Sequence, residues 1–235
     1  MRTTVSELKS DAREQLLGKY MQFFPLLLVY FVLELVAGYL PLLMFTASDA
    51  FTGIARFGTS FILNVLFGMA GVGLIKASLD FIRGQSFGVG TLFYAFRNNA
   101  DTFVIIQLVL TAVKTAFSFL SLIVDHYSVL YEWTDMVYYL VYSASLLGIL
   151  FLTMTATLKL IWSCYFVIDG DAQTAGEALR MSLKFSKGRT FEIFYMKLSF
   201  IGMFILSYCS MLIGFIYVRP YTEVTYALYY LNKKQ

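Results

Sequence analysis

The sequence predicts an all-α protein, a polytopic transmembrane bundle of about five spanning helices with amphipathic helices at its surface. Of its 235 residues, 59% are hydrophobic and only 14% are charged, which leaves too little polar surface to cover a soluble domain. The charges also avoid about five long apolar stretches. We expect one integral membrane domain over 1–235, with a cytoplasmic amphipathic helix at 1–20, a transmembrane bundle at 21–218 and an interfacial tail at 219–235.

The first expected element is a short helix that precedes the first span. Thr4 and Glu7 have the spacing of a capping box, in which each side chain accepts a hydrogen bond from the other residue's backbone N–H. One side of this helix is apolar and carries Val5, Leu8, Ala12 and Leu16. The opposite side carries charges, so the helix is expected to lie along the membrane surface.

The apolar stretches give the spans. The first, at 21–43, is long enough to cross a bilayer and is followed by no small-residue cleavage pattern, which favours an anchor over a secretion signal. The others are expected at 57–82, 102–124, 136–168 and 191–218. The fourth would be ~50 Å long at ~1.5 Å per residue, against a hydrocarbon core of ~30 Å. It must tilt or project into water, and we expect it to project at the cytoplasmic face.

The orientation follows from lysine and arginine near the span ends. These residues gather before the first span, between the second and third, and between the fourth and fifth. The positive-inside bias therefore predicts a cytoplasmic N-terminus. After the fifth span, Pro220 and Tyr221 open a tyrosine-rich segment, which we interpret as an interfacial helix at the aromatic belt. The alternative is a re-entrant final helix that returns the tail to the cytoplasm.

The two cytoplasmic loops resemble each other, which predicts a weak internal duplication. In the second loop, Thr174 and Glu177 repeat the capping-box spacing, and Gly188 suits the C-terminal cap of the helix that follows. Its apolar side is expected to carry Ala175, Ala178, Leu179 and Leu183. Each loop then ends in a Thr-Phe pair, at 102–103 and at 190–191, which opens the next span.

Three lysines lie about two turns inside the predicted spans, at Lys76, Lys159 and Lys197. Their long stems can reach the membrane surface, so snorkelling is the simpler interpretation. The functional alternative is a basic pocket beneath the cytoplasmic surface that holds an anionic phospholipid headgroup. The helix of the second loop would add to its attraction, through Arg180, Lys184, Lys187 and Arg189.

Glu34 and Lys114 lie deeper, at about the same level near the middle of their spans. An unpaired charge at that depth costs ~2.5–3.5 kcal/mol on insertion scales, so a contact between the two side chains is expected. Such a pair can serve as an interhelical tie or as part of a proton or ion relay. Asn64 can join either arrangement as a hydrogen-bond partner.

The sequence contains no recognisable catalytic or cofactor-binding motif. The single histidine, His126, falls in an acidic outer loop beside Asp125, Glu132 and Asp135, where a solvated face is the simplest interpretation. Both cysteines lie in apolar stretches and are interpreted as buried hydrophobes. We expect no cofactor, no metal and no nucleic-acid partner. Asp169-Gly170-Asp171 is assigned turn and capping roles.

Several short stretches resemble the bacterial membrane family called domain-of-unknown-function family 975. They are Ala12 to Lys19, Ser182 with Lys187-Gly188-Arg189, Phe194, Leu198-Ser199-Phe200-Ile201-Gly202, and Pro220-Tyr221 with Tyr229-Tyr230. Tyr20 and Met203 stand where that family often has tryptophan. The resemblance covers nearly the whole chain and implies a multi-span protein of the bacterial plasma membrane. It implies no activity, because none is assigned to the family.

These observations support three hypotheses of function. The first is a non-enzymatic membrane protein whose basic cytoplasmic face engages anionic lipid or a protein partner. The second is a small transporter or exporter component with a pathway past Glu34 and Lys114. The third, a membrane-embedded enzyme that modifies lipids, is disfavoured because the chain lacks recognisable catalytic groupings.

Overall fold

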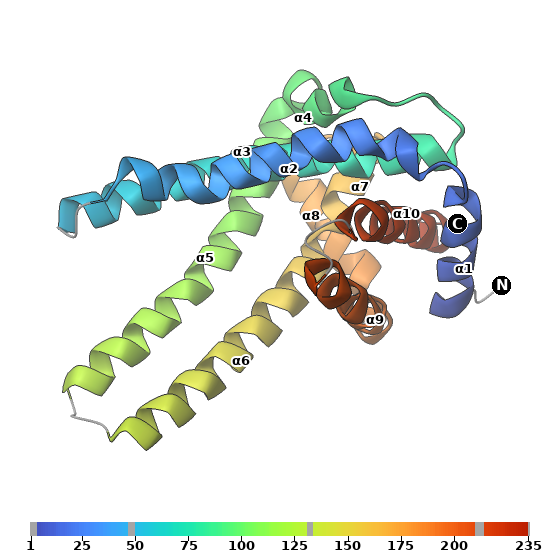
Figure 1. The fold of residues 1–235 in the computed structure, drawn as a ribbon. Coiled ribbons are helices and arrows are strands. Elements are labelled where there is room, and N and C mark those ends of the chain that lie inside the picture. Colours follow the sequence, from blue (N-terminus) through green and yellow to red (C-terminus); the bar gives the residue numbers. More distant parts are fainter. Residues whose placement is uncertain (1–3, 47–49, 131–133, 210–213, 235) are drawn as a thin grey trace.

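The chain folds entirely into helices, and a computed structural model defines their arrangement (Figure 1). It describes the backbone of residues 4–46, 50–130, 134–209 and 214–234, and their side chains except at 50, 116–130, 135, 149, 150 and 208. Within these ranges there is no strand. Four helical segments are long and apolar enough to cross a membrane, at Tyr20–Met44, Phe51–Ile82, Met136–Ile168 and Thr190–Ser207. The predicted all-α bundle is thus confirmed.

Two helical pairs form the arms of the molecule. Helices α2 (Tyr20–Met44) and α3 (Ala50–Ile82) pack together, as do α5 (Ala100–Leu130) and α6 (Asp135–Leu160). Figure 1 shows the two pairs diverging toward the tips formed by the end of α2 and the start of α3, and by the end of α5 and the start of α6. We call these tips the distal end. The third predicted span, 102–124, lies within α5, and only part of that helix has described side chains.

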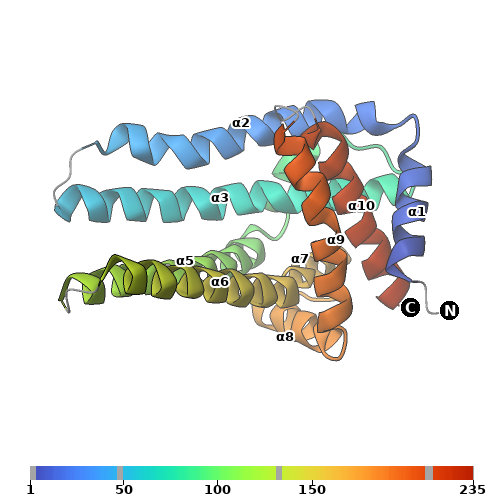
Figure 2. The same cartoon turned by 60° about the horizontal axis from the view of Figure 1, so that its bottom comes forward.

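The other end of the molecule, which we call the basal end, gathers the remaining short elements. Helix α1 (Val5–Leu16) lies beside α10 (Phe215–Lys234), and α7 (Trp162–Ile168) packs against α8 (Ala175–Ser186). A short segment, η1 (Val89–Phe93) with α4 (Tyr94–Arg97), folds back over α3. Helix α9 (Thr190–Cys209) and α10 cross the long arms instead of running parallel to them (Figure 2).

Helix α1 has the predicted form, because the signals that determine it are local. Thr4 accepts a hydrogen bond from the Glu7 amide at 3.3 Å, and the Glu7 carboxylate accepts one from the Thr4 amide at 2.8 Å. The buried residues of α1 are the four predicted ones, Val5, Leu8, Ala12 and Leu16. They join the core against α10, so one apolar stripe fixes how this helix docks.

The fourth predicted span is not one continuous helix. It breaks at Ile161, and α7 continues as a separate helix with six of its seven residues buried. At this break the Lys159 carbonyl accepts hydrogen bonds from the Ser182 and Ser186 hydroxyls of α8. The expectation that this end projects into water is therefore wrong, because it packs into the basal core instead.

The same contact explains which face of α8 is buried. The Thr174 hydroxyl caps the helix by accepting from the Glu177 amide at 3.3 Å, and the positive φ of Gly188, +77°, agrees with the prediction. The Glu177 carboxylate accepts from the Gln173 amide and not from the Thr174 amide, so only half of the predicted capping box forms. Ala175 and Ala178 are buried as expected, but Ser182 and Ser186 replace the predicted leucines, and Leu183 is 48% exposed. The two hydroxyls turn inward because the helix break offers them an acceptor.

The C-terminal segment differs most from the prediction. The fifth predicted span, 191–218, is divided between α9 and α10, and α10 begins before Pro220. The predicted interfacial tail, 219–235, instead forms most of a helix whose Tyr229 and Tyr230 are fully buried. Their rings pack against Trp162, Tyr165 and Phe185. These tyrosines belong to the core, and α10 packs beside α1, so the segment is not an exposed tail.

An internal duplication was predicted from the similarity of the loop between α3 and α5 to the loop between α7 and α9. The structures of these two loops differ. One contains the twelve-residue α8, and the other contains η1 and a helix of four residues. Their Thr-Phe pairs are not equivalent, because Phe103 is 1% exposed and Phe191 is 81% exposed. The duplication does not extend to these loops.

Candidate functional site

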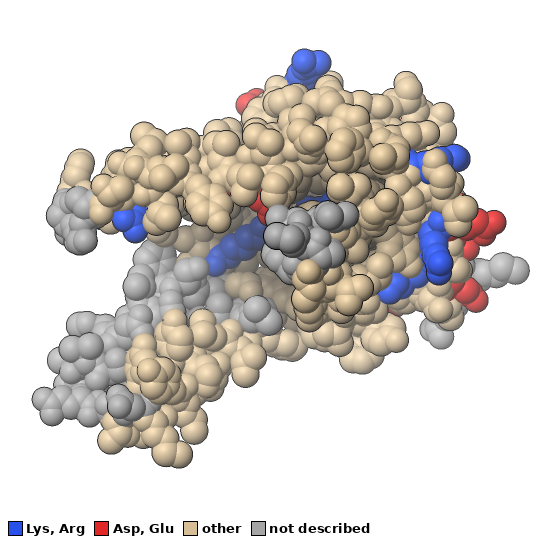
Figure 3. Space-filling view, in the orientation of Figure 1, with Lys and Arg blue, Asp and Glu red and all other residues tan. Residues whose placement is uncertain are grey.

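The strongest candidate site is a polar cavity of about 350 Å³ between the two arms. Two of the three deep polar residues predicted from the sequence, Asn64 of α3 and Lys114 of α5, line it. Figure 3 shows the hollow between the arms, with lysine and arginine side chains inside it. At ~1.5 Å per residue, Lys114 lies ~21 Å along α5, well away from either helix end.

The predicted contact between Glu34 and Lys114 is not formed. Among the described side chains no ion pair joins them, and Glu34 is exposed and does not line the cavity. Asn64 donates its amide to the Ser60 carbonyl at 2.8 Å, a bond within its own helix.

Helix α10 supplies two charged residues of this cavity, and sequence reasoning missed both. The Arg219 guanidinium lies 3.3 Å from the Glu223 carboxylate, one helical turn away, and donates to the Tyr30 hydroxyl at 3.3 Å. It also stacks 5.3 Å from the centre of the Tyr30 ring. The prediction that 219–235 is a tail left both residues outside the expected bundle. The four-residue spacing of Arg219 and Glu223 in an otherwise apolar stretch was the sequence feature that could have indicated an ion pair on a buried helix.

The electrostatic balance of the cavity is positive. Lys114 and Arg219 line it, with Glu223 as the opposing carboxylate among the lining residues. An anion entering the cavity would therefore meet net attraction, which is strengthened by the low-dielectric surroundings of the apolar arms.

Small residues on α3 give this cavity its shape. A methyl group on Gly68 would lie 2.3 Å from the Gln107 side-chain oxygen, so glycine allows that amide to approach α3. Gln107 is buried and donates to the Cys164 sulfur at 3.8 Å. Glycine at this position of α3 therefore admits a polar side chain from α5.

The residues predicted to hold a headgroup are spread over separate surroundings. Lys76 forms an ion pair with Asp80 one turn along α3 and lies 5.6 Å from the Tyr94 ring centre. Lys197 lines a different, smaller cavity. Lys159 is partly buried at the end of α6. The three lysines therefore do not share the partners that one pocket would give them.

The predicted basic cluster on α8 is largely a surface feature. Arg180, Lys184 and Lys187 are exposed. Arg189 instead turns back to the core, where it donates to the Lys233 carbonyl at 3.5 Å and lies 5.2 Å from the Phe185 ring centre. The exposed three can attract anions at the basal surface, but they enclose nothing.

A second ionic group ties the chain together at the basal end. The Asp169 carboxylate, 6% exposed, accepts from Arg83 at 2.7 Å, from Lys234 at 2.7 Å and from the Tyr230 hydroxyl at 3.1 Å. Asp171 pairs with Lys234 as well. The aspartates predicted to act in a turn thus also clamp the end of α10.

These contacts shift the pKa values of both partners. Burial raises the pKa of the Asp169 carboxyl, but the hydrogen bonds from Lys234 and Arg83 outweigh it and hold that pKa below its ordinary value. Burial lowers the pKa of Lys234, but its bonds to Asp169 and Asp171 raise it above the ordinary value. Both shifts favour the charged, paired forms near neutral pH.

Some predicted positions lie outside the described residues. The side chains of His126, Asp125, Glu132 and Asp135 belong there. The described side chains hold no group of three or more histidine, cysteine, aspartate or glutamate residues placed to bind a metal ion.

Comparison with known proteins agrees with the resemblance seen in the sequence. No curated protein and no solved structure matches the chain. A family model does match it, over residues 1–235, its full length. The chain therefore belongs to the family described as "Protein of unknown function (DUF975)".

Proposed function

We propose that this protein is an integral membrane protein that binds the anionic headgroup of a membrane amphiphile in the cavity of Lys114 and Arg219. The observation that carries the proposal is the placement of two cations in one cavity, with Glu223 as the opposing carboxylate among the residues that line it. Arg219 already has Glu223 at 3.3 Å, whereas Lys114 has no described ion-pair partner. Lys114 is therefore the cation available to a ligand.

The surroundings of the cavity support an amphiphile as the ligand. The arms that border it are apolar helices of membrane-spanning length, and they diverge toward the distal end (Figure 1). A headgroup can occupy the polar cavity while its hydrocarbon chains lie along these arms. A volume of about 350 Å³ falls at the lower end of the usual range for small-molecule sites.

The orientation belongs to the same proposal. Exposed Arg180 and Lys184 lie on α8, Lys187 follows as its C-terminal cap, and Arg13 lies exposed on α1, which also belongs to the basal end. The positive-inside bias favours a basal end that faces the cytoplasm of a bacterial plasma membrane, with both described chain ends on that side.

The test is the amount of lipid that stays with the purified protein. Lys114→Gln removes the available cation and keeps a similar length, so we expect about tenfold weaker retention of phosphatidylglycerol in nanodisc exchange, because a hydrogen bond to a charged group contributes ~1.5–3 kcal/mol. Lys184→Gln removes the same charge from the exposed face of α8 and should change nothing. Equal retention by the wild-type protein and Lys114→Gln would refute the proposal.

Transport of an anionic amphiphile between leaflets is the second candidate, and the position of Lys114 near the middle of α5 favours it. Its pathway would pass Lys114, Arg219 and Glu223, and Glu34 would not line it. Proteoliposomes that exchange an anionic amphiphile between leaflets, at a rate abolished by Lys114→Gln, would support transport. Tight binding without any exchange would favour the binding role alone.

A further inference from the structure

The cavity of Lys114 and Arg219 is lined by hydrogen-bond acceptors as well as by cations. The acceptors belong to the side chains of Asn64, Gln107 and Glu223. In small-molecule sites a few placed polar groups determine which ligand is accepted. A ligand that offered only anionic oxygens would leave these acceptors without a partner, so they restrict the headgroup beyond its charge.

Glu223 is the strongest of these acceptors. Its side chain is 13% exposed and lines the cavity, so a ligand can reach the carboxylate. Among the described residues it forms an ion pair with Arg219 Nε at 3.3 Å, but it accepts no hydrogen bond. An ionised carboxylate can accept about four hydrogen bonds. Glu223 therefore keeps the capacity to accept one from a ligand.

The two amides of the lining add neutral acceptors. The Asn64 nitrogen donates to the Ser60 carbonyl at 2.8 Å, and the Gln107 nitrogen donates to the Cys164 sulfur at 3.8 Å. Neither amide oxygen accepts a hydrogen bond from the described residues. With the nitrogens engaged in this way, the oxygens are the groups that remain for a donor on the ligand.

The anion-binding group and the main acceptor lie side by side. Arg219 and Glu223 are one helical turn apart on α10, and the Arg219 guanidinium is held by Tyr30, whose hydroxyl lies at 3.3 Å and whose ring centre lies at 5.3 Å. A headgroup whose anion binds Arg219 therefore brings its neighbouring atoms close to the Glu223 carboxylate. This arrangement exists before any ligand arrives, which lowers the cost of binding.

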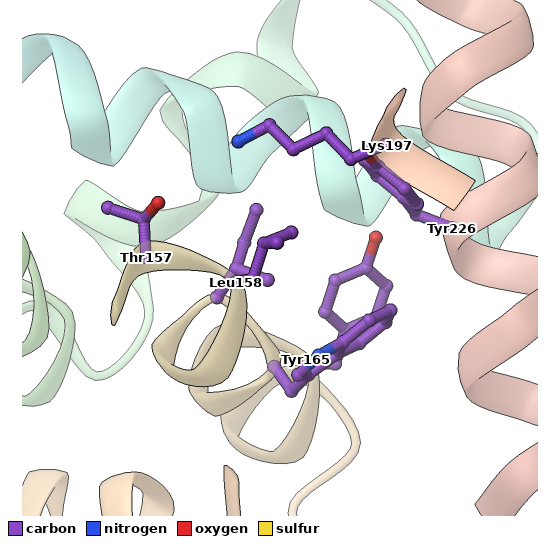
Figure 4. A pocket seen from close by; sticks show the side chains of 7 residues that line it. Thr157, Leu158, Tyr165, Lys197 and Tyr226 are labelled. Atoms are coloured by element: carbon purple, nitrogen blue, oxygen red, sulfur yellow. The ribbon is translucent and has the colours of Figure 1, made fainter. Parts of the chain in front are cut away.

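The charges of the lining favour a ligand with a single negative charge. Lys114 and Arg219 oppose Glu223, and no other charged residue lines the cavity. Lys197 lines a separate cavity of about 40 Å³ together with Tyr165 and Tyr226 (Figure 4). A headgroup with one negative charge balances the lining, whereas a more highly charged phosphomonoester would be repelled by Glu223.

We propose that this cavity selects a headgroup that combines a single negative charge with a hydrogen-bond donor. The anion binds Lys114 and Arg219, and the donor binds the Glu223 carboxylate. The inference rests on the proposed function and adds the class of ligand to it. The donor can be a hydroxyl or an ammonium, because a carboxylate accepts from both.

Three lipids of the same net charge separate these features. Phosphatidylglycerol supplies hydroxyls, phosphatidylserine supplies an ammonium, and phosphatidylpropanol has nearly the size of phosphatidylglycerol but no headgroup donor. The protein is exchanged into phosphatidylcholine nanodiscs that contain equal amounts of phosphatidylpropanol and one of the donor lipids. After repurification, mass spectrometry measures the ratio of the two retained lipids.

We expect the wild-type protein to retain at least one donor lipid about tenfold over phosphatidylpropanol, the factor typical of a hydrogen bond to a charged group. The preferred lipid identifies the donor as a hydroxyl or an ammonium. Glu223→Gln should bring the ratio close to one, because a neutral amide is a weaker acceptor. It should also retain more phosphatidylpropanol than the wild type, because the opposing charge is gone. Glu14→Gln, which removes a carboxylate from the exposed side of α1, is the matched control.

Equal retention of all three lipids by the wild-type protein would overturn the proposal without any variant. So would an unchanged ratio in Glu223→Gln, once circular dichroism shows that the variant is folded. Lys114→Gln should lower the retention of all three lipids together and leave their ratio unchanged. Equal retention that still depends on Lys114 therefore refutes the selection alone, whereas retention independent of Lys114 refutes the proposed function and the selection with it.

Discussion

At the scale of single residues, Gly73 has the most demanding position on α3. A methyl group there would lie 2.3 Å from the Leu92 Cα and 2.6 Å from the Thr91 carbonyl oxygen. These are backbone atoms of η1, which cannot move aside as a flexible side chain can. Gly73 therefore allows the connection between α3 and α5 to fold closely onto α3.

We expect Gly73→Ala to destabilise the protein by about 1–3 kcal/mol, the usual cost of overpacking. Gly58→Ala is the matched control, because the added methyl meets nothing within 4 Å and alanine is the better helix former by up to about 1 kcal/mol. Thermal unfolding in detergent should show a lower midpoint for the first variant only. A lower midpoint for both would mean that helix α3 tolerates no alanine, and the contact with η1 would not be the cause.

Asp169 and Asp171 permit a second comparison at this scale. Asp169→Asn weakens contacts to Arg83, Lys234 and Tyr230 in a side chain that is 6% exposed, so we expect a loss of about 2 kcal/mol in unfolding free energy. Asp171 is 30% exposed, and its variant Asp171→Asn should lose less than about 1 kcal/mol. Denaturant unfolding of the two proteins measures the difference, and equal losses would contradict a central role for Asp169.

At the scale of elements, the pH dependence of stability reports on the clamp at the end of α10. The Lys234 pKa lies above its ordinary value of 10.5, so its contribution is complete below that value and is lost as the pH rises through the folded-state pKa. The Asp169 pKa lies below its ordinary value of 3.8, so its contribution is present above 3.8 and is lost as the pH falls through the folded-state pKa.

We therefore expect a stability plateau between these limits and a fall above about pH 10.5 in the wild-type protein. Buried tyrosines also destabilise the fold in alkali, so the informative quantity is the difference between two profiles. Lys234→Gln should have a lower plateau and a smaller alkaline fall than the wild type, in thermal midpoints measured from pH 6 to about 11.5. Parallel profiles would show that Lys234 contributes no charge-dependent stability.

Comparison of α1 with α8 shows when a local sequence pattern is sufficient to predict a helix and its buried face. The cap and apolar stripe of α1 lie within sixteen residues, so the pattern predicts both the helix and its buried face. The buried face of α8 depends on the Lys159 carbonyl, which is freed by the break at Ile161. Neither proline nor glycine stands at Leu160, Ile161 or Trp162. A local pattern therefore predicts a continuous span there, and the break depends on tertiary packing.

At the scale of the whole molecule, the sequence predicts some residues of the candidate site and not others. The deep positions of Asn64 and Lys114 follow from counting along their spans, and both line the cavity. Equal depth did not suffice to predict a contact between Glu34 and Lys114. Depth gives a residue's level along its helix, but it does not show which side of that helix packs against the other helix. Arg219 and Glu223 enter the site only because α10 turns back, and composition alone does not reveal that reversal.

The reversal has a consequence for topology. Lys234 reaches Asp169, which follows α7, and Arg83, which follows α3, also contacts Asp169. The end of α10 therefore lies at the basal end together with α1 (Figure 2). An interfacial tail after a fifth crossing would instead have left the C-terminus on the opposite side from the N-terminus.

Single cysteines can test this arrangement in cells, after replacement of Cys164 and Cys209 by serine. A membrane-impermeant maleimide should label Thr134→Cys, at the distal end, in intact cells. It should label Ser6→Cys and Asn232→Cys only after lysis, because both exposed residues belong to the basal end, which the positive-inside bias assigns to the cytoplasm. Labelling of Asn232→Cys but not Ser6→Cys in intact cells would contradict the return of α10. Labelling of both, with Thr134→Cys protected, would keep that return and invert only the orientation in the membrane.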